Sequence, residues 1–292
     1  MKIKEKALIT TLKFLGKLSL RNNYRLSCGI RCVLKCFPLR LQKTIHTNLS
    51  RCLPNLPAHA MQSLEKQVFF HTILRMVEMP FFWFGPSHDA LICEISGEAD
   101  FQVDFQKGQG MIVLVPHLGA WEVVNFYMGQ RYPSVSLYKP IKKAHQEELV
   151  RLGRERYGTE MFPTTISGVK SLFASLKRGK CAGILPDHDP GDNGGIMVPF
   201  FGISANTTTL IAKLGEKSGA PIYFMVAERL PKGSGFHLHF VKANETLKSK
   251  NLEEAATAMN QGVSDLITQF PEQYEWSYKR FRRTQWNGQY FY

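Results

Sequence analysis

The chain has 292 residues, of which 44% are hydrophobic and 21% are charged. This length and composition exclude a disordered protein and allow one large domain with a full core that needs no disulfide bonds. The formal net charge of +13 indicates an anionic partner, which could be nucleic acid, anionic lipid or an acidic carrier protein. Six cysteines in a chain of this length do not suggest a disulfide framework, so we infer a reducing compartment.

The N-terminal segment is strongly basic, with twelve Lys or Arg and a single acid in residues 1–51. As a helix, residues 6–20 are amphipathic: three leucines group on one side and three lysines on the other. These residues are Leu8, Leu12 and Leu15, and Lys6, Lys13 and Lys17. Such a helix can lie on an anionic bilayer, although the leucines could instead dock on the protein core. We predict a membrane-associating segment at 1–45 and a folded domain at 46–292.

A short aromatic run, MPFFWF, occupies residues 79–84. It is too short to span a bilayer, and no stretch of the chain approaches the ~18 uncharged apolar residues of a spanning helix. The run fits either the protein core or the lining of a lipid groove.

From residue 92 onward, short apolar runs alternate with helical patterns. We predict strands at 111–115, 134–139, 181–185, 221–227 and 236–241, of which the last alternates as a more exposed strand does. Helices are predicted from residue 121 and at 142–157, 168–178, 207–218 and 252–268, with Asn206 as the N-cap and Gly219 as the stop of the fourth. The alternation predicts an α/β fold with a central, mostly parallel sheet flanked by helices.

The motif PHLGAWE at 116–122 places His117 directly after the strand 111–115. Open α/β sheets place their sites at such carboxyl ends. Glu122 follows in the first turn of the next helix, and Gly119 would allow the intervening loop to fold back and bring the two side chains together. A carboxylate on one ring nitrogen orients an imidazole and leaves the other nitrogen to accept a proton. The missing nucleophile would be a substrate hydroxyl that attacks a thioester, but a single histidine after a strand is also often structural.

Other catalytic or metal-binding motifs are weaker. There is no Gly-x-Ser-x-Gly elbow, no Gly-x-x-x-x-Gly-Lys-Ser/Thr loop and no His-Glu-x-x-His. His237 and His239 share one strand face, which could hold a metal. The sequence shows no persuasive third ligand, so we interpret the pair as an exposed strand face and predict no metal.

An ordered set of motifs resembles the bacterial lipid A biosynthesis lauroyl/myristoyl acyltransferases, which are membrane-associated relatives of the glycerolipid acyltransferases with a shared His-x4-Asp/Glu motif. The resemblance covers roughly residues 45–285. The motifs are NLSRCLP at 48–54, the His117 to Glu122 stretch, LPD at 185–187, VPFFG at 198–202 followed by Ala205 and Thr207, and PEQYEW at 271–276 with a basic-aromatic tail through Arg283.

The resemblance implies an O-acyltransferase that moves a fatty acyl chain from acyl carrier protein to a hydroxyl of a lipid A precursor, the secondary acylation of lipopolysaccharide biosynthesis. His117 would be the general base and Glu122 would orient it, with no acyl-enzyme, no metal and no cofactor besides the acyl donor. The acyltransferase domain at 46–292 would have a glycerolipid acyltransferase-like fold on the cytoplasmic face of the inner membrane. The alternative is the same chemistry on a glycerophospholipid, an amino-acid lipid or another glycolipid.

The resemblance also suggests substrate-binding residues. Arg154 and Arg156 match the Arg-x-Arg of the family, and we expect Arg154 to contact an acceptor phosphate or the developing oxyanion. Asp187 follows the strand 181–185 and should face the same site, where it could anchor a cation, accept a substrate hydrogen bond or hold the loop. Lys139 stands where the family usually has Arg, so it keeps the charge but loses the bidentate fork. His188 stands where the family usually has Gln.

The tail YKRFRR at 278–283 interleaves aromatic and basic side chains. That pattern is also typical of RNA-binding proteins, so a non-catalytic basic protein that binds lipid or nucleic acid is the rival hypothesis. The resemblance favours anionic glycolipid head groups, the acidic carrier protein and the anionic membrane surface as partners, and no nucleic acid.

Overall fold

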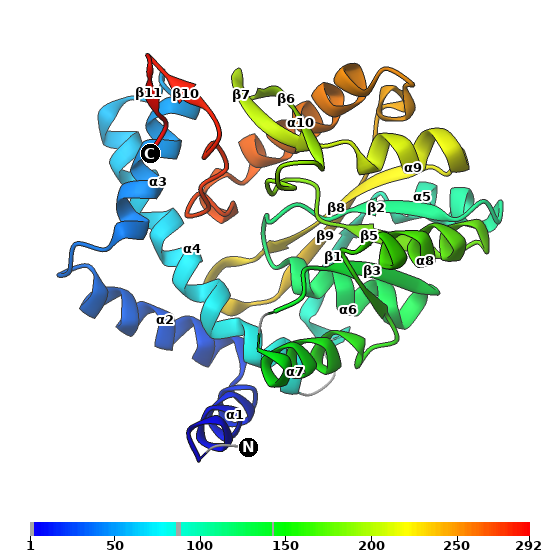
Figure 1. Ribbon diagram of the computed structural model, residues 1–292. Coiled ribbons are helices and arrows are strands. Elements are labelled where there is room, and N and C mark those ends of the chain that lie inside the picture. Colours follow the sequence, from blue (N-terminus) through cyan, green and yellow to red (C-terminus); the bar gives the residue numbers. More distant parts are fainter. Residues whose placement is uncertain (1–2, 86–88, 142) are drawn as a thin grey trace.

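The computed structural model describes residues 3–85, 89–141 and 143–292. Four helices come first in the chain and lie together on one side of a central sheet (Figure 1). They are α1 (Ile3–Leu15), α2 (Leu20–Leu34), α3 (Arg40–Cys52) and α4 (Ala58–Phe84). None of the described helices combines the length and apolarity needed to cross a membrane.

The central sheet has seven strands in the order β1-β9-β8-β2-β5-β3-β4. They are β1 (Ile92–Ser96), β2 (Met111–Leu114), β3 (Ser134–Tyr138), β4 (Glu160–Pro163), β5 (Cys181–Ile184), β8 (Ile222–Arg229) and β9 (Phe236–Lys242). Only the β8–β9 pair is antiparallel among these neighbours. The predicted α/β fold with a mostly parallel sheet is therefore confirmed.

Helices cover both faces of this sheet. They are α5 (Glu98–Gln106), α6 (Trp121–Arg131), α7 (Ala144–Glu155), α8 (Ile166–Lys177), α9 (Leu210–Ser218) and α10 (Leu252–Gln269). Strand β2 shows why the sheet must be covered twice, because Ile112 and Leu114 enter one hydrophobic core while Met111 and Val113 enter the other. A strand buried on both faces reads as a continuous apolar run, as the sequence of residues 111–115 does.

Two predicted details of the α9 region are wrong. Residues 207 and 208 complete the antiparallel hairpin β6 (Gly195–Phe200) and β7 (Ile203–Thr208), so the helix begins at Leu210. Asn206 does not cap it, because its Nδ2 atom donates to Asp189 Oδ1 at 2.8 Å and to the Gly191 carbonyl at 2.9 Å. The predicted stop is confirmed, since Gly219 has a left-handed φ of 67°.

Short elements complete the chain. They are the 3₁₀ helices η1 (Asp89–Leu91), η2 (Pro231–Gly233), η3 (Glu245–Lys248) and η4 (Pro271–Gln273), and the ribbon of β10 (Gln285–Trp286) and β11 (Gln289–Tyr290).

The aromatic run at 79–84 forms the last turns of α4 and belongs mainly to the core. Phe81, Phe82 and Trp83 are all buried, and the ring of Phe82 lies 5.8 Å from that of Phe236 on β9. Met79 and Phe82 also line a small cavity beside Trp121 and Glu122. This contact brings α4 next to the segment that follows β2.

Helix α3 runs across residue 45, where the sequence predicts the N-terminal segment to end. Ile45 is buried, and the Asn48 side-chain amide donates to the carbonyls of Trp276 and Tyr278 at 2.7 and 2.9 Å. The division at residue 45 stays a prediction, and the side chains of Lys6 and Leu8 lie outside the described residues.

Candidate active site

The loop after β2 holds His117 at the carboxyl edge of the sheet, as predicted. The Ala120 N–H donates to the Ala227 carbonyl of β8 at 2.8 Å, and the Gly119 N–H donates to the Gln273 carbonyl at 3.2 Å. Gly119 has a φ of 63°, and a Cβ there would lie 2.1 Å from the Ala227 oxygen. Only glycine fits this close approach, so the sequence lets the loop press against β8 and fixes the position of His117.

Asp187 is the carboxylate that holds His117. It follows β5, the neighbour of β2, and its Oδ1 atom lies 2.8 Å from His117 Nδ1. Its Oδ2 atom accepts the backbone N–H of His117 at 2.9 Å. Because one carboxylate grips both the ring and the main chain, it places the proton on Nδ1 and the lone pair on Nε2. The predicted bond from Glu122 to this ring is not observed, since Asp187 occupies that role.

The electrostatics of the pair favour a basic imidazole. Burial by itself would lower the pKa of His117, but the charge of Asp187 and its hydrogen bond outweigh burial and raise that pKa above its usual value. Burial would raise the pKa of the Asp187 carboxyl, yet His117 holds it well below its usual range. Within the described residues Nε2 of His117 has no hydrogen-bond partner, and the side chain keeps 11% exposure. It can therefore take a proton from a ligand.

The imidazole of His117 is the first of three stacked rings. The His188 ring lies 3.6 Å from it, centroid to centroid, with a 2° angle between planes, and Tyr278 stacks on the far side of His188 at 3.8 Å. Burial and the nearby His117 lower the pKa of His188, which favours a neutral ring. His188 is therefore held between two rings, and its stacking helps to fix the plane of the His117 imidazole.

A second carboxylate anchors this stack from the C-terminal part of the chain. Glu275 Oε2 lies 3.3 Å from His188 Nε2, and its Oε1 accepts from Arg75 of α4 at 2.7 Å. Burial opposes ionisation of Glu275, but His188 and Arg75 together bring its pKa down to about 2. His117, His188 and Glu275 offer ligand-type atoms within 4.8 Å of one another. Asp187 and Arg75 account for the polar contacts of His117 and Glu275, whereas the buried His188 Nε2 has no hydrogen-bond partner among the described residues.

Glu122 reaches His117 only through intermediates. It is buried and accepts two hydrogen bonds from Arg154, from Nη2 at 2.9 Å and from Nε at 3.1 Å. The Arg154 guanidinium lies 4.7 Å above the Trp121 ring, whose edge faces His117 with centroids 5.8 Å apart. Glu122 thus positions a cation beside the base, and a direct catalytic role for it stays a prediction.

Lys139 and Arg156 lie further out. Lys139 follows β3 at the carboxyl edge of the sheet and is exposed to solvent. Arg156 donates to the Trp83 carbonyl of α4 at 3.4 Å, and its guanidinium lies 5.2 Å from the Tyr157 ring. Of the predicted site residues, the structure therefore brings together His117, Asp187, Glu122 and Arg154, with Lys139 and Arg156 outside that group.

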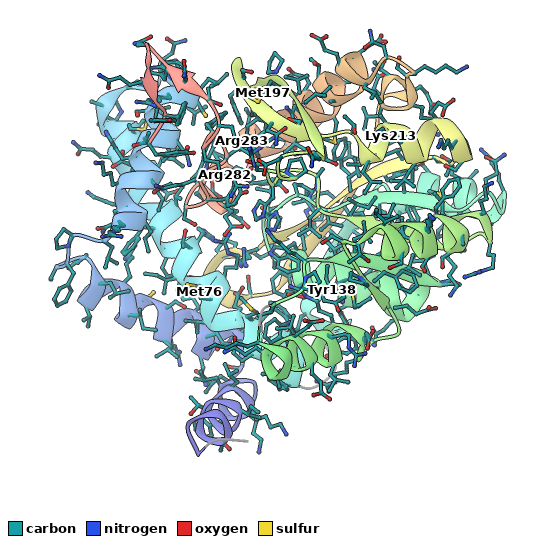
Figure 2. All side chains as sticks on the ribbon, in the orientation of Figure 1. Met76, Tyr138, Met197, Lys213, Arg282 and Arg283 are labelled. Carbon is teal, nitrogen blue, oxygen red and sulfur yellow. The ribbon has the colours of Figure 1, made fainter. Side chains whose placement is uncertain are left out.

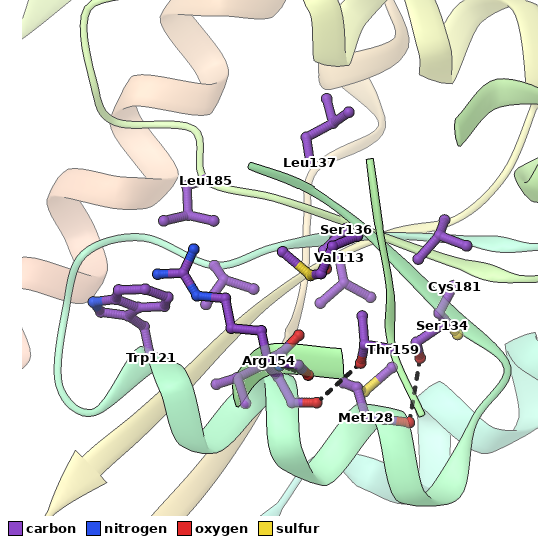
Figure 3. A pocket seen from close by; sticks show the side chains of 16 residues that line it. Val113, Trp121, Met128, Ser134, Ser136, Leu137, Arg154, Thr159, Cys181 and Leu185 are labelled. Atoms are coloured by element: carbon purple, nitrogen blue, oxygen red, sulfur yellow. Dashed lines mark hydrogen bonds between the residues drawn. The ribbon is translucent and has the colours of Figure 1, made fainter. Parts of the chain in front are cut away.

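An apolar cavity opens beside Trp121 and Arg154 (Figure 3). Its empty volume is about 510 Å³, including space open to solvent, and it is lined mainly by side chains of β2, β3, β5 and α6. Leu185 lies at the catalytic end, whereas Ser134 and Cys181 lie where β3 and β5 begin. The cavity therefore runs along the strands for about 13 Å, at a rise of about 3.3 Å per residue.

The basic tail is used largely within the protein. Arg280 is buried and donates to Thr207 Oγ1 at 2.8 Å, while Arg282 and Arg283 bind Asp189 Oδ2 through Nε at 2.6 and 2.8 Å (Figure 2). These bonds tie the tail to the loop that carries Asp187. Arg282 and Arg283 still keep 44% and 34% exposure, so contact of the tail with anionic partners stays a prediction.

Arg75, Glu275 and Tyr278 were not predicted as site residues. Glu275 lies within the closing PEQYEW motif and Tyr278 lies in the tail that follows it. Their place in this family motif was the sequence signal that could have identified them as site residues. Arg75 lies in the middle of the long helix α4, where the sequence gives no comparable signal.

A base with an open nitrogen, a neighbouring cation and a cavity for an apolar chain form the kind of site that an acyltransferase uses. The chain belongs to the bacterial lipid A biosynthesis acyltransferase family, which it matches over residues 6–283. It is 28% identical to the lipid A biosynthesis lauroyltransferase of Escherichia coli K12 over 261 residues, which are 89% of this chain and 85% of that protein. It is 25% identical to the palmitoleoyltransferase of the same organism over 259 residues, 88% of this chain and 84% of that protein. A lipid A biosynthesis acyltransferase of Haemophilus influenzae is 24% identical, covering 79% of this chain and 72% of that protein.

Proposed function

We propose that this acyltransferase moves a fatty acyl chain from acyl carrier protein to a hydroxyl of a lipid A precursor. Family membership supports the acceptor, and the cavity beside Trp121 supports a fatty acyl donor. The single observation that carries the chemistry is the His117–Asp187 pair, whose imidazole keeps Nε2 open at the carboxyl edge of the sheet.

In the proposed reaction, Nε2 of His117 takes the proton of the acceptor hydroxyl while its oxygen attacks the thioester carbonyl carbon. A carbon–oxygen bond forms, the carbon–sulfur bond breaks, and the carrier thiolate leaves and takes the proton back from the imidazolium. Asp187 stabilises the imidazolium in between. General base catalysis of this kind contributes about 10²–10⁴-fold to rate.

Arg154 is the proposed stabiliser of negative charge, either on the thioester oxygen as it develops or on a phosphate of the acceptor. Glu122 and Trp121 hold its guanidinium at the mouth of the cavity, and Nη1 has no partner among the described residues. A preorganised donor of this type stabilises developing charge without reorganisation. Lys139 and Arg156 are proposed as outer cations for the acceptor phosphates.

The donor chain is proposed to occupy the apolar cavity, with its length set by the far end. Ser136 lines the middle of the cavity from β3. Replacement by Phe should shorten the usable space and shift activity toward shorter acyl donors. Acyl carrier proteins loaded with chains of different length measure this shift, and an unchanged preference would place the chain elsewhere.

The N-terminal helices are proposed to hold the enzyme on the cytoplasmic face of the inner membrane. Phe14, Val33 and Phe37 are 67%, 61% and 56% exposed, and the basic Arg25 and Lys35 lie exposed between them in sequence. Exposed apolar and cationic side chains together suit an anionic bilayer surface. Deletion of residues 1–20 should weaken flotation with anionic vesicles, most visibly at high salt. Unchanged flotation would contradict this part of the proposal.

The function is tested by mass spectrometry of lipid A from cells that lack the protein, with and without wild-type or His117→Ala complementation. Loss of one secondary acyl chain, restored only by the wild type, is the expected result. Unchanged lipid A with an altered glycerophospholipid, amino-acid lipid or other glycolipid would instead favour the alternative acceptors. An unchanged lipid profile in both strains would contradict acyl transfer.

A further inference from the structure

A second cluster of imidazoles and carboxylates lies on a face of the sheet away from His117. Strand β9 alternates as predicted, with Phe236, Leu238 and Phe240 buried while His237 and His239 share the other face. The two imidazole rings lie 3.9 Å apart with a 35° angle between their planes. Both are about one-fifth exposed, so the pair is accessible from solvent.

The ligand missing from the sequence pattern comes from the antiparallel neighbour. Glu228 of β8 pairs in register with His237. Its Oε2 atom lies 3.0 Å from His239 Nε2 and 3.7 Å from His237 Nδ1. From the other side, Glu94 of β1 is also in register with His237, and its Oε2 lies 3.1 Å from the same Nδ1. Side chains of the adjacent strands β1, β9 and β8 thus converge on the Nδ1 atom of His237.

Ser96 of β1 contacts the ring nitrogen of His237 that points away from Glu228 and Glu94, and its hydroxyl can accept or donate there. Its Oγ atom lies 2.7 Å from His237 Nε2. If that nitrogen carries the proton and donates to Ser96, the lone pair of Nδ1 faces Glu228 and Glu94. Metal-binding histidines usually have such a hydrogen bond on the ring nitrogen that does not bind the metal.

We propose that His237 Nδ1, His239 Nε2 and Glu228 form a site for a divalent transition metal, with Zn²⁺ as the best chemical match. The three ligand atoms lie within 4.8 Å of one another. Zn²⁺ binds imidazole nitrogen at about 2.0–2.1 Å and carboxylate oxygen at about 2.0–2.2 Å, so side-chain movements of about 1 Å close the site. Glu94, which is mostly exposed, or water completes the coordination.

A bound cation also resolves the charge arrangement of the cluster. A metal bound between the two rings, whose centroids lie 3.9 Å apart, would balance the charge of the two facing carboxylates. Carbonyl or carboxylate sites for Mg²⁺ or Ca²⁺ would use oxygen ligands alone, so the paired nitrogens favour Zn²⁺ over them.

The position of the site gives it a structural consequence. Glu228 directly follows Ala227, whose carbonyl accepts the Ala120 N–H of the catalytic loop. Arg229, the next residue, exchanges hydrogen bonds with the Gln273 side chain. A metal that links β1, β8 and β9 would therefore stabilise the strand against which the His117 loop rests.

The test uses metal-stripped, untagged, full-length protein in detergent and Zn²⁺ alone as the probe. Competition with a chromogenic chelator should show one Zn²⁺ per chain, and Zn²⁺ should raise the Tm. His239→Ala and the isosteric Glu228→Gln should weaken binding by more than ~100-fold, and Ser96→Ala by about 10–100-fold. The matched control His59→Ala changes an exposed histidine of α4 and should bind as the wild type does.

His188→Gln separates this site from the cluster at His117. Retained Zn²⁺ binding in that variant supports the proposal, whereas loss of binding there would move the metal to the other cluster and overturn it. The proposal would also be overturned if the wild type bound Zn²⁺ no more tightly than the His239→Ala and Glu228→Gln variants do. The Tm of each metal-free variant shows that it is folded before its affinity is compared.

Discussion

Two pairs of neighbouring imidazoles in one molecule have different surroundings. His117 and His188 lie nearly parallel; the His117 side chain is 11% exposed and that of His188 is 36% exposed, and His117 is tied by ring and backbone to Asp187. His237 and His239 lie on an open strand face, where carboxylates of neighbouring strands approach the ring nitrogens. We infer that a carboxylate hydrogen-bonded to both the ring and the main chain suits an imidazole to act as a base. Ring nitrogens that face carboxylates of neighbouring strands instead suit an imidazole to bind a metal.

The largest expected effect distinguishes the two pairs directly. His117→Ala removes the base and should lower kcat by about 10²–10⁴-fold, whereas His237→Ala should cost less than about tenfold because no reacting atom contacts it. Turnover of acyl carrier protein thioester by purified enzyme measures both. Comparable losses of kcat in the two variants would contradict the different roles assigned to the two pairs. The His59→Ala variant controls for general effects of losing an imidazole.

Asp187→Asn should produce the next largest effect and a characteristic pH shift. A neutral base is the proposed active form, so kcat/KM should rise with pH through the pKa of His117, which Asp187 raises above its usual value in the wild type. The amide removes the charge that raises this pKa. The rate should fall by about 10²-fold, and the acid limb should move to lower pH. The control Glu228→Gln should leave the acid limb of the pH profile in place. An acid limb that does not move in Asp187→Asn would contradict the proposal that Asp187 raises the pKa of His117.

Glu122→Gln should have a smaller effect that acts through Arg154. Hydrogen bonds to a charged partner are worth about 1.5–3 kcal/mol, so we expect a loss of about 10–150-fold in kcat/KM, with a large share in KM. Steady-state kinetics at several acceptor concentrations separate the two constants. If the folded variant had a normal KM but a kcat as low as that of His117→Ala, the result would indicate that Glu122, and not Asp187, orients His117.

The smallest effect is expected for His188→Gln. The amide keeps a polar group near Glu275 but loses the ring stacked on His117, so activity should fall less than about tenfold. The pH profile should keep its acid limb. A loss of 10²-fold or more would place His188 among the groups that contact the reacting atoms.

The sequence predicts the frame of the site well, for a physical reason. Strand runs such as residues 111–115 are apolar on both faces, so the parallel sheet and its carboxyl edge follow from pattern alone. His117 and Asp187 each follow such a strand, and β2 and β5 prove to be neighbours, which brings both residues to one site as expected. The alternation at 236–241 likewise places His237 and His239 on one face.

The partners of these residues were harder to predict because they depend on side-chain direction across strands. Spacing allows Glu122 to meet His117, but the turn at Gly119 directs Glu122 toward Arg154 instead. Glu275 reaches the site from a segment more than 150 residues away in the chain. The third group beside His237 was invisible for the same reason, since only the β8–β9 register places Glu228 opposite it.

The central claim is that Asp187 makes His117 the base, and ¹⁵N NMR of the histidine rings tests it most directly. We expect His117 to have its proton on Nδ1 when neutral and a pKa above its usual value, and we expect Asp187→Asn to lower this pKa. A proton on Nε2, or a pKa that does not respond to Asp187→Asn, would contradict the account.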